Sequence, residues 1–182
     1  ISFFKFMKNI LFIILLPLSI FSQNTVCFNI ETNPNPEILA LSLFTKYINV
    51  FDCVHIYAEQ SISDQKVLHA AAIAAELLDN NEDGIIDDDN VKNKLMSIYT
   101  VMPLFAYEGS NAEDLLFDNF EDLMDNNNFC AGAVLYSNEI DPSSPGFWGN
   151  DASVEEILHT INTCSHIEIY PNVFGLDPNS SD

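Results

Sequence analysis

An acidic segment, DNNEDGIIDDDN at 79–90, lies between two stretches of the chain with helical periodicity. Apolar residues before and after it recur at the three- and four-residue spacing that marks one face of a helix. These positions are Val67, Ala70, Ala71, Ala74, Leu77 and Leu78 in the first stretch, and Val91, Leu95 and Ile98 in the second. The sequence therefore predicts a helix–loop–helix unit over 61–99.

The acidic segment resembles the calcium-binding loop of the EF-hand family. That loop binds calcium through positions 1, 3, 5, 7, 9 and 12 and turns at a glycine in position 6. In this chain the ligand positions fall on Asp79, Asn81, Asp83, the Ile85 carbonyl, Asp87 and Asn90. Gly84 occupies the glycine position, and Ile86 is the apolar residue at position 8. The resemblance implies one bound calcium ion at this loop.

The loop departs from the family at its last ligand position, where Asn90 replaces a bidentate glutamate. This replacement removes one oxygen and one negative charge, so it lowers the expected affinity. A single loop of this kind favours a structural calcium site over a calcium sensor. The alternative is a solvated acidic turn in which Gly84 serves only as a helix C-cap.

Residues 155–159, EEILH, resemble the HExxH helix of zincin metallopeptidases, with glutamate in place of the first histidine. The resemblance implies His159 as a zinc ligand, Glu156 as the general base and Glu155 as a carboxylate ligand. His166 is a further candidate ligand if the helix ends between the two histidines, which a continuous helix would separate by about 10.5 Å. A purely structural alternative places the acids at the positive end of the helix dipole.

The N-terminus has the order of a secretory signal. Residues 1–6 precede Met7 and are interpreted as read-through from upstream sequence, and residues 7–22 join a short basic start to the apolar run ILFIILLPLSIF. A membrane-spanning helix needs about 20 apolar residues, so we expect cleavage near Ser22 and no stable membrane span afterwards. Residues 23–182 then form a single secreted domain, extracellular or periplasmic. The last residues, DPNSSD, form no closing element, which leaves a C-terminal truncation open.

The charge balance excludes one class of partner. The formal net charge is −21 and the chain contains no arginine, whereas a nucleic-acid partner requires a basic face. A cation such as calcium is the expected partner instead. The hydrophobic content of 48% argues against disorder.

Four cysteines also bear on the compartment. Cys27, Cys53, Cys130 and Cys164 form an even set, which in an exported chain predicts two disulfides with three alternative pairings. Pairing Cys27 with Cys53 and Cys130 with Cys164 would close the shortest loops. No CxxC motif occurs, so we do not expect a structural zinc ion held by these thiolates.

The remaining segments predict an α+β fold that is mostly helical, with a small strand component. Further helices are expected over 110–124 and 153–164, each starting at a capping-box sequence. Residues 129–136, FCAGAVLY, predict a buried strand, and the proline-containing residues 101–107, VMPLFAY, fit an edge strand or a loop. Residues 37–51 fit either a short buried helix or a pair of strands.

Two functions are compatible with these patterns. The first is a secreted acidic calcium-binding protein with a structural calcium site. The second is a zinc-dependent, metallopeptidase-like hydrolase with a degenerate EExxH helix. Nucleophile-elbow and phosphate-loop glycine patterns are absent from the sequence, so serine hydrolase and nucleotide-binding functions are not expected.

Overall fold

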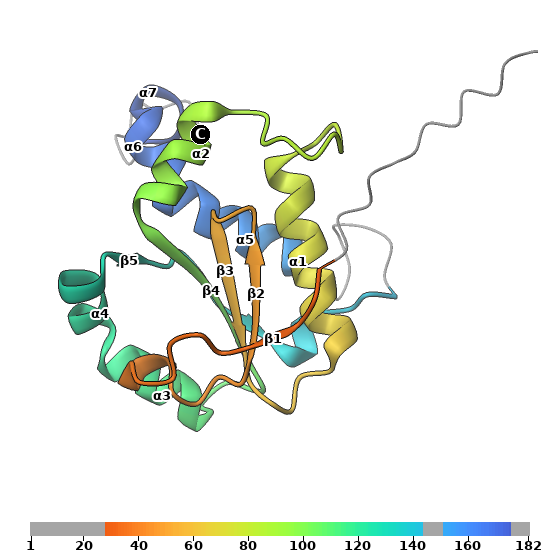
Figure 1. The fold of residues 1–182 in the computed structure, drawn as a ribbon, viewed down its shortest axis with the longest axis vertical. Coiled ribbons are helices and arrows are strands. Elements are labelled where there is room, and N and C mark those ends of the chain that lie inside the picture. Colours follow the sequence, from red (N-terminus) through yellow and green to blue (C-terminus); the bar gives the residue numbers. More distant parts are fainter. Residues whose placement is uncertain (1–27, 144–150, 176–182) are drawn as a thin grey trace, which may run out of the picture.

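The computed structural model describes residues 28–143 and 151–175. At its centre is a six-stranded mixed sheet with strand order β1-β2-β3-β4-β5, in which β6 also pairs with β4 (Figure 1). The strands are β1 (Glu31–Thr32), β2 (Lys46–Val50), β3 (Val54–Ala58), β4 (Tyr99–Phe105), β5 (Phe129–Cys130) and β6 (Leu135–Tyr136). The pairs β1–β2 and β2–β3 are antiparallel, whereas β4 runs parallel to β3, β5 and β6.

Helices lie on both faces of this sheet (Figure 1). The longer ones are α1 (Asp64–Leu78), α2 (Asp89–Ser97), α3 (Asn111–Asp118), α4 (Phe120–Asn127) and α5 (Ser153–Ile161). The shorter ones are η1 (Leu39–Leu41), η2 (Ser137–Glu139), the π-helical η3 (Asn162–His166), α6 (Ile167–Ile169) and α7 (Pro171–Phe174). One buried cluster joins the sheet to α1, α2 and α5, and a second joins it to η1, α3 and α4. The described residues thus form three layers, with the sheet in the middle.

Side-chain alternation along β4 explains how this strand serves both clusters. Met102 and Leu104 belong to the cluster with α1 and α5, whereas Val101 and Phe105 belong to the cluster with α3. Successive side chains of a strand point to opposite faces of the sheet. A strand covered by helices on both faces is therefore apolar at nearly every position.

The expectation of a mostly helical fold is wrong, although the α+β class is correct. The mixed sheet is the central layer, and its strand β3, with the sequence VHIYA, is buried at every residue. This strand lacks the apolar–polar alternation of a half-buried strand, because neither of its faces meets water. Residues 37–51, which fitted either a helix or strands, contain both η1 and β2.

β4 is a central strand and not the edge strand or loop expected for residues 101–107. β5 pairs with the first two residues of β4 and β6 with the last two, so Pro103 lies beside the gap between them. The Leu104 carbonyl accepts a hydrogen bond from the Glu59 N–H at 3.3 Å on the β3 side. Backbone N–H and C=O groups of successive strand residues point to alternate sides, so the Pro103 nitrogen points away from β3, toward the gap between β5 and β6. No strand pairs with β4 at this gap, so the missing N–H of proline costs no hydrogen bond between strands.

Residues 129–136 form two short strands instead of the single buried strand that was expected. Residues 131–134, between β5 and β6, make no strand pairing with β4. The interruption lies beside Pro103, which cannot donate a ladder hydrogen bond. Residues 131–134 and Pro103 line the same cavity.

The helix predicted over 110–124 starts at its capping box but divides into α3 and α4. The Ser110 Oγ accepts a hydrogen bond from the Glu113 N–H at 3.3 Å. At Asn119 the helix breaks, where the side-chain Nδ2 donates to the Leu115 carbonyl at 2.8 Å. Asparagine side chains compete for backbone carbonyls in this way, which disfavours them inside helices.

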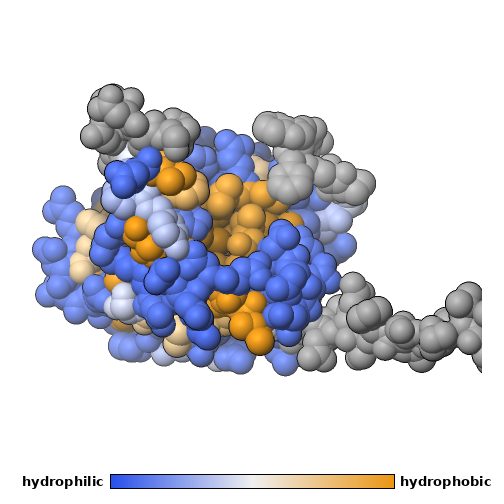
Figure 2. Space-filling view, turned by 90° about the horizontal axis from the view of Figure 1, so that it is seen from above, coloured by the Kyte–Doolittle hydropathy of each residue, from blue (hydrophilic) through white to orange (hydrophobic). Residues whose placement is uncertain are grey.

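The surface is largely hydrophilic in the view toward the end that carries α2 and the acidic loop, with an apolar patch at its centre (Figure 2). Within the described ranges, no helix is long and apolar enough to cross a membrane. The predicted signal peptide, residues 7–22, and residues 1–6 lie outside the described residues.

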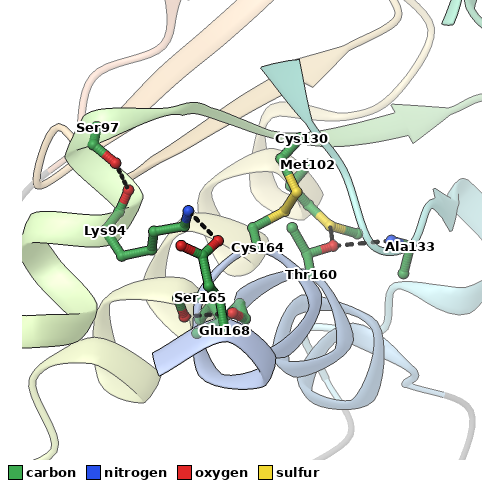
Figure 3. The surroundings of a disulfide bond; sticks show 10 residues. Lys94, Ser97, Met102, Cys130, Ala133, Thr160, Cys164, Ser165 and Glu168 are labelled. Atoms are coloured by element: carbon green, nitrogen blue, oxygen red, sulfur yellow. Dashed lines mark hydrogen bonds and ion pairs between the residues drawn. A yellow bond between two sulfur atoms is a disulfide. The ribbon is translucent and has the colours of Figure 1, made fainter. Parts of the chain in front are cut away.

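Cys130 and Cys164 form a disulfide with a Cα–Cα distance of 5.8 Å, which ties β5 to η3 (Figure 3). This confirms one of the two predicted bridges. Cys53 is a buried free thiol whose Sγ lies 3.8 Å from the Lys92 carbonyl oxygen, and burial raises its pKa to about 11. Cys27, the partner predicted for Cys53, lies outside the described residues.

Candidate functional site

The helices α1 and α2 present the acidic loop at one end of the molecule (Figure 1). α1 ends at Leu78, and the next residue, Asp79, is only 4% exposed. Its Oδ1 accepts a hydrogen bond from the Asp83 N–H at 3.2 Å, and its Oδ2 accepts one from the Gly84 N–H at 2.7 Å. Gly84 has φ +86°, a conformation that glycine adopts without a steric penalty. The loop therefore curls back onto its first carboxylate.

Two further ligand candidates belong to the same turn. The Asn81 Oδ1 accepts a hydrogen bond from the Asp83 N–H at 2.9 Å, so oxygens of Asn81 and Asp79 converge on one nitrogen. The Asp83 Oδ1 accepts a hydrogen bond from the Ile85 N–H, also at 2.9 Å. Loop positions 1, 3 and 5 are thereby linked through consecutive side chain to backbone hydrogen bonds.

Asp87 closes the far side of the loop. Its Oδ1 accepts a hydrogen bond from the Asn81 Nδ2 at 3.0 Å, and its Oδ2 accepts one from the Asn80 N–H at 2.9 Å. Its own N–H donates to the Leu78 carbonyl at 2.9 Å, and the neighbouring Ile86 enters the core with 6% exposure. These contacts fix the end of the loop against the end of α1.

The last ligand candidate, Asn90, lies apart from this unit. It is exposed at the start of α2, and its Nδ2 donates a hydrogen bond to the Tyr170 hydroxyl at 3.2 Å. The hydrogen bonds of the loop thus bring together Asp79, Asn81, Asp83 and Asp87. Asn90 is directed toward the C-terminal helices instead.

Asp88 connects the loop to the same tyrosine. Its Oδ1 accepts a hydrogen bond from the Asn90 N–H at 2.8 Å and caps α2, while its Oδ2 accepts one from the Tyr170 hydroxyl at 2.6 Å. The pKa of the Asp88 carboxyl is lowered, and the hydrogen bond from Tyr170 contributes most to this shift. Asp88 is therefore a structural residue that stabilises the start of α2.

The oxygen-rich composition of the loop suits a hard cation. Calcium takes about six to eight oxygens from carboxylates, amide and backbone carbonyls and water. Among the described residues, no group of three or more His, Cys, Asp and Glu side chains is arranged to hold a metal ion. Coordination at this loop would therefore require the neutral oxygens of Asn81 and Ile85, together with water, beside the carboxylates.

The three predicted zinc ligands do not converge, because His166 lies apart from Glu155 and His159. Glu155 and His159 are exposed on one face of α5, with Oε1 and Nε2 4.0 Å apart. α5 continues through η3 into α6, so the helix does not end between His159 and His166, as a shared zinc ion would require. The His166 ring instead stacks on Phe174 at 4.8 Å, and its Nδ1 lies 3.1 Å from the Asn162 Oδ1. The described residues give the zinc hypothesis no support.

The predicted general base, Glu156, lies in a different environment. It is half-buried on α5 and lines a cavity together with Tyr136, Glu139 and His159. Burial raises the pKa of the Glu156 carboxyl, and the charges of Glu155 and Glu139 raise it further, whereas His159 acts in the opposite direction. Glu156 is thus a partly desolvated carboxyl group that lines a cavity.

Two features of these sites were missed in the sequence. Tyr170 contacts Asp88 across a separation of 82 residues, and no local pattern marks it. The cavity that contains Glu156 is lined by side chains from β4, from residues 131–134 and from four helices. Neither the Tyr170–Asp88 contact nor the cavity is marked by a periodic pattern or a motif in the sequence.

Comparison of the chain with protein-family models, with curated proteins and with solved structures found no match.

Proposed function

We propose that the protein is an exported, acidic calcium-binding protein in which residues 79–90 hold one calcium ion. The observation that carries the proposal is the double acceptor role of the buried Asp79 carboxylate toward Asp83 and Gly84. A carboxylate has about four acceptor sites, so these two hydrogen bonds leave capacity for an ion. Calcium would also offset the repulsion among loop carboxylates in a chain of net charge −21.

The proposed role of the ion is structural. It would join the end of α1 to the start of α2, two helices that pack into the same buried cluster. An ion that binds only the folded chain stabilises it by about 2.7 kcal/mol at a hundredfold excess over Kd. The asparagine at position 12 favours the weak range of extracellular calcium modules, with Kd of about 10⁻⁴–10⁻³ M.

Calorimetric titration with calcium tests the proposal directly. We expect one ion per chain, with magnesium binding more weakly because it demands a stricter octahedral geometry. Asp79→Asn and Asp83→Asn each remove a ligand charge, so either should weaken calcium binding by about tenfold or more. The matched control is Asp89→Asn, which removes the same charge from an exposed position outside the ligand set. Equal weakening in the control would indicate diffuse attraction to an acidic surface and would refute a specific site.

Export is the second part of the proposal. It is supported by the signal-like order of residues 7–22 and by the Cys130–Cys164 disulfide, since such bridges persist in oxidising compartments. Expression with the native leader should release a chain whose N-terminus lies near Gln23. An exported chain that still begins at Met7 would contradict cleavage.

A further inference from the structure

A cavity of about 480 Å³ opens where β5 and β6 separate. Pro103 of β4, residues 131–134 and Tyr136 of β6 line it, and α3, α4, α5 and η2 contribute the remaining residues. Small-molecule sites occupy about 300–1,000 Å³, so the volume suits a small ligand. None of the calcium-loop residues contributes to this lining.

The chain segment 131–134 is held firmly against α5. A Cβ at Gly132 would lie 2.6 Å from the His159 carbonyl oxygen and 2.7 Å from the Thr160 Cα, so only glycine permits this approach. The Ala133 N–H donates to the Thr160 Oγ1 at 3.1 Å, and the disulfide anchors β5 just before the segment (Figure 3). A wall fixed before binding reduces the ordering cost that a ligand must overcome.

Part of the lining is apolar and aromatic. Leu116, Phe117 and Phe120 come from the α3–α4 layer, and Phe117 is 53% exposed. Tyr136 adds another ring, whose hydroxyl donates to the Glu113 Oε1 at 2.5 Å. Such rings pack against an apolar body, and their faces attract cations within about 6 Å.

The rest of the lining is acidic. It contains Glu139, which accepts the Tyr136 N–H at 3.2 Å, and Glu156. Among the described residues that line the cavity, none is a lysine and His159 is the one histidine. Two carboxylates beside an apolar surface are electrostatically complementary to a positively charged ligand.

We propose that this cavity binds a small organic ammonium ion with an apolar or aromatic body. The ammonium group would lie at Glu139 and Glu156, where charge-assisted hydrogen bonds are available. The body of the ligand would pack on Phe117 and Phe120. The proposal is independent of the calcium loop, because the two sites share no residue.

The experiment titrates 2-phenylethylamine into the full chain by calorimetry, with and without calcium. Its neutral analogue, 2-phenylethanol, has nearly the same shape and lacks the charge. Glu139→Gln and Glu156→Gln each remove one carboxylate of the cavity at constant shape. Glu155→Gln is the matched control, since it removes the same charge from the adjacent exposed residue of α5, outside the cavity.

We expect saturable binding of the amine at one site, with the alcohol weaker by about tenfold or more. Each cavity variant should weaken amine binding by about tenfold, while Glu155→Gln should change it by less than about twofold. Equal affinity for amine and alcohol in the wild type would overturn the proposal, as would absence of saturable binding. A loss in Glu155→Gln as large as in Glu156→Gln would also overturn it, because attraction would then be diffuse.

Discussion

The hydroxyl of Tyr170 donates a hydrogen bond to the Asp88 Oδ2 at 2.6 Å, which joins the C-terminal helices to the residue that caps α2. An ion pair between Lys94 and Glu168 connects the same two regions. The acidic loop is therefore held at its start by α1 and at its end by a contact with the C-terminal helices. Stability of this end of the molecule should depend on residues far from the loop in sequence.

Tyr170→Phe should lower the free energy of unfolding at pH 7 by about 1–2 kcal/mol, because a hydrogen bond to a charged group is lost. The bond also lowers the pKa of Asp88, so its contribution is present above the usual aspartate pKa of about 3.9 and is lost as pH falls below it. Urea unfolding should therefore show a difference that shrinks below about pH 4. The exposed Tyr107→Phe is the control, with an expected effect within about 0.5 kcal/mol. A pH-independent difference would contradict the assignment.

His55 should be neutral in the folded chain at physiological pH. Burial lowers its pKa to about 4, while the charge of Asp52 acts in the opposite direction. Its Nδ1 lies 2.7 Å from the Tyr47 hydroxyl, and its ring stacks on Tyr99 at 3.9 Å. An unfolded histidine titrates near about 6.5, so stability should be fully present above that pH and should fall as pH decreases toward about 4, by about 2–3 kcal/mol.

Nuclear magnetic resonance titration of the folded chain measures this directly. The His55 ring signals should shift with a midpoint near pH 4. A midpoint near about 6.5, the value of an unperturbed histidine, would contradict the buried neutral state.

Loss of the Cys130–Cys164 disulfide should destabilise the fold by about 3–4 kcal/mol, because the bridge closes a loop with a separation of 34 residues. The double variant Cys130→Ser/Cys164→Ser and the reduced wild type should unfold at similar urea concentrations. Adding reductant to the double variant is the control and should have no further effect. A large additional loss would reveal a second bridge and contradict the free state of Cys53.

Gly132→Ala should destabilise the chain by about 1–3 kcal/mol or more, because the added methyl group would overlap backbone atoms of α5. The obstructing atoms belong to His159 and Thr160 and cannot move without shifting the helix. Urea unfolding measures the change. An effect within about 0.5 kcal/mol would mean that the segment 131–134 does not approach α5 this closely.

Local patterns in the sequence were enough to predict the helices beside the acidic loop. The apolar stripe of α1 is periodic, and Val67, Ala74 and Leu78 are buried as it requires. The sheet was underestimated for a physical reason. β3 is buried on both faces and has no alternation, and the place of β4 depends on pairing with strands more than 20 residues away.

The candidate sites, too, have some features that local sequence predicts and others that depend on tertiary packing. The Asp79, Asn81 and Asp83 turn spans five residues, so its spacing is visible in the sequence. The orientation of Asn90 depends on Tyr170, which only tertiary packing brings near. His159 and His166 were linked by an assumption about where a helix ends, and the π-helical continuation through η3 contradicts that assumption.

The melting temperature with and without millimolar calcium shows whether residues 79–90 hold a calcium ion. Calcium bound only to the folded chain raises the melting temperature of the wild type, and Asp79→Ala, which removes the buried carboxylate of the loop, should abolish the rise. Asp89→Ala, which removes a carboxylate outside the ligand set, should retain most of the rise. We therefore expect a calcium-dependent rise in the wild type that Asp79→Ala lacks. A wild-type melting temperature indifferent to calcium would contradict the proposed site and would show that residues 79–90 form a turn without a bound ion.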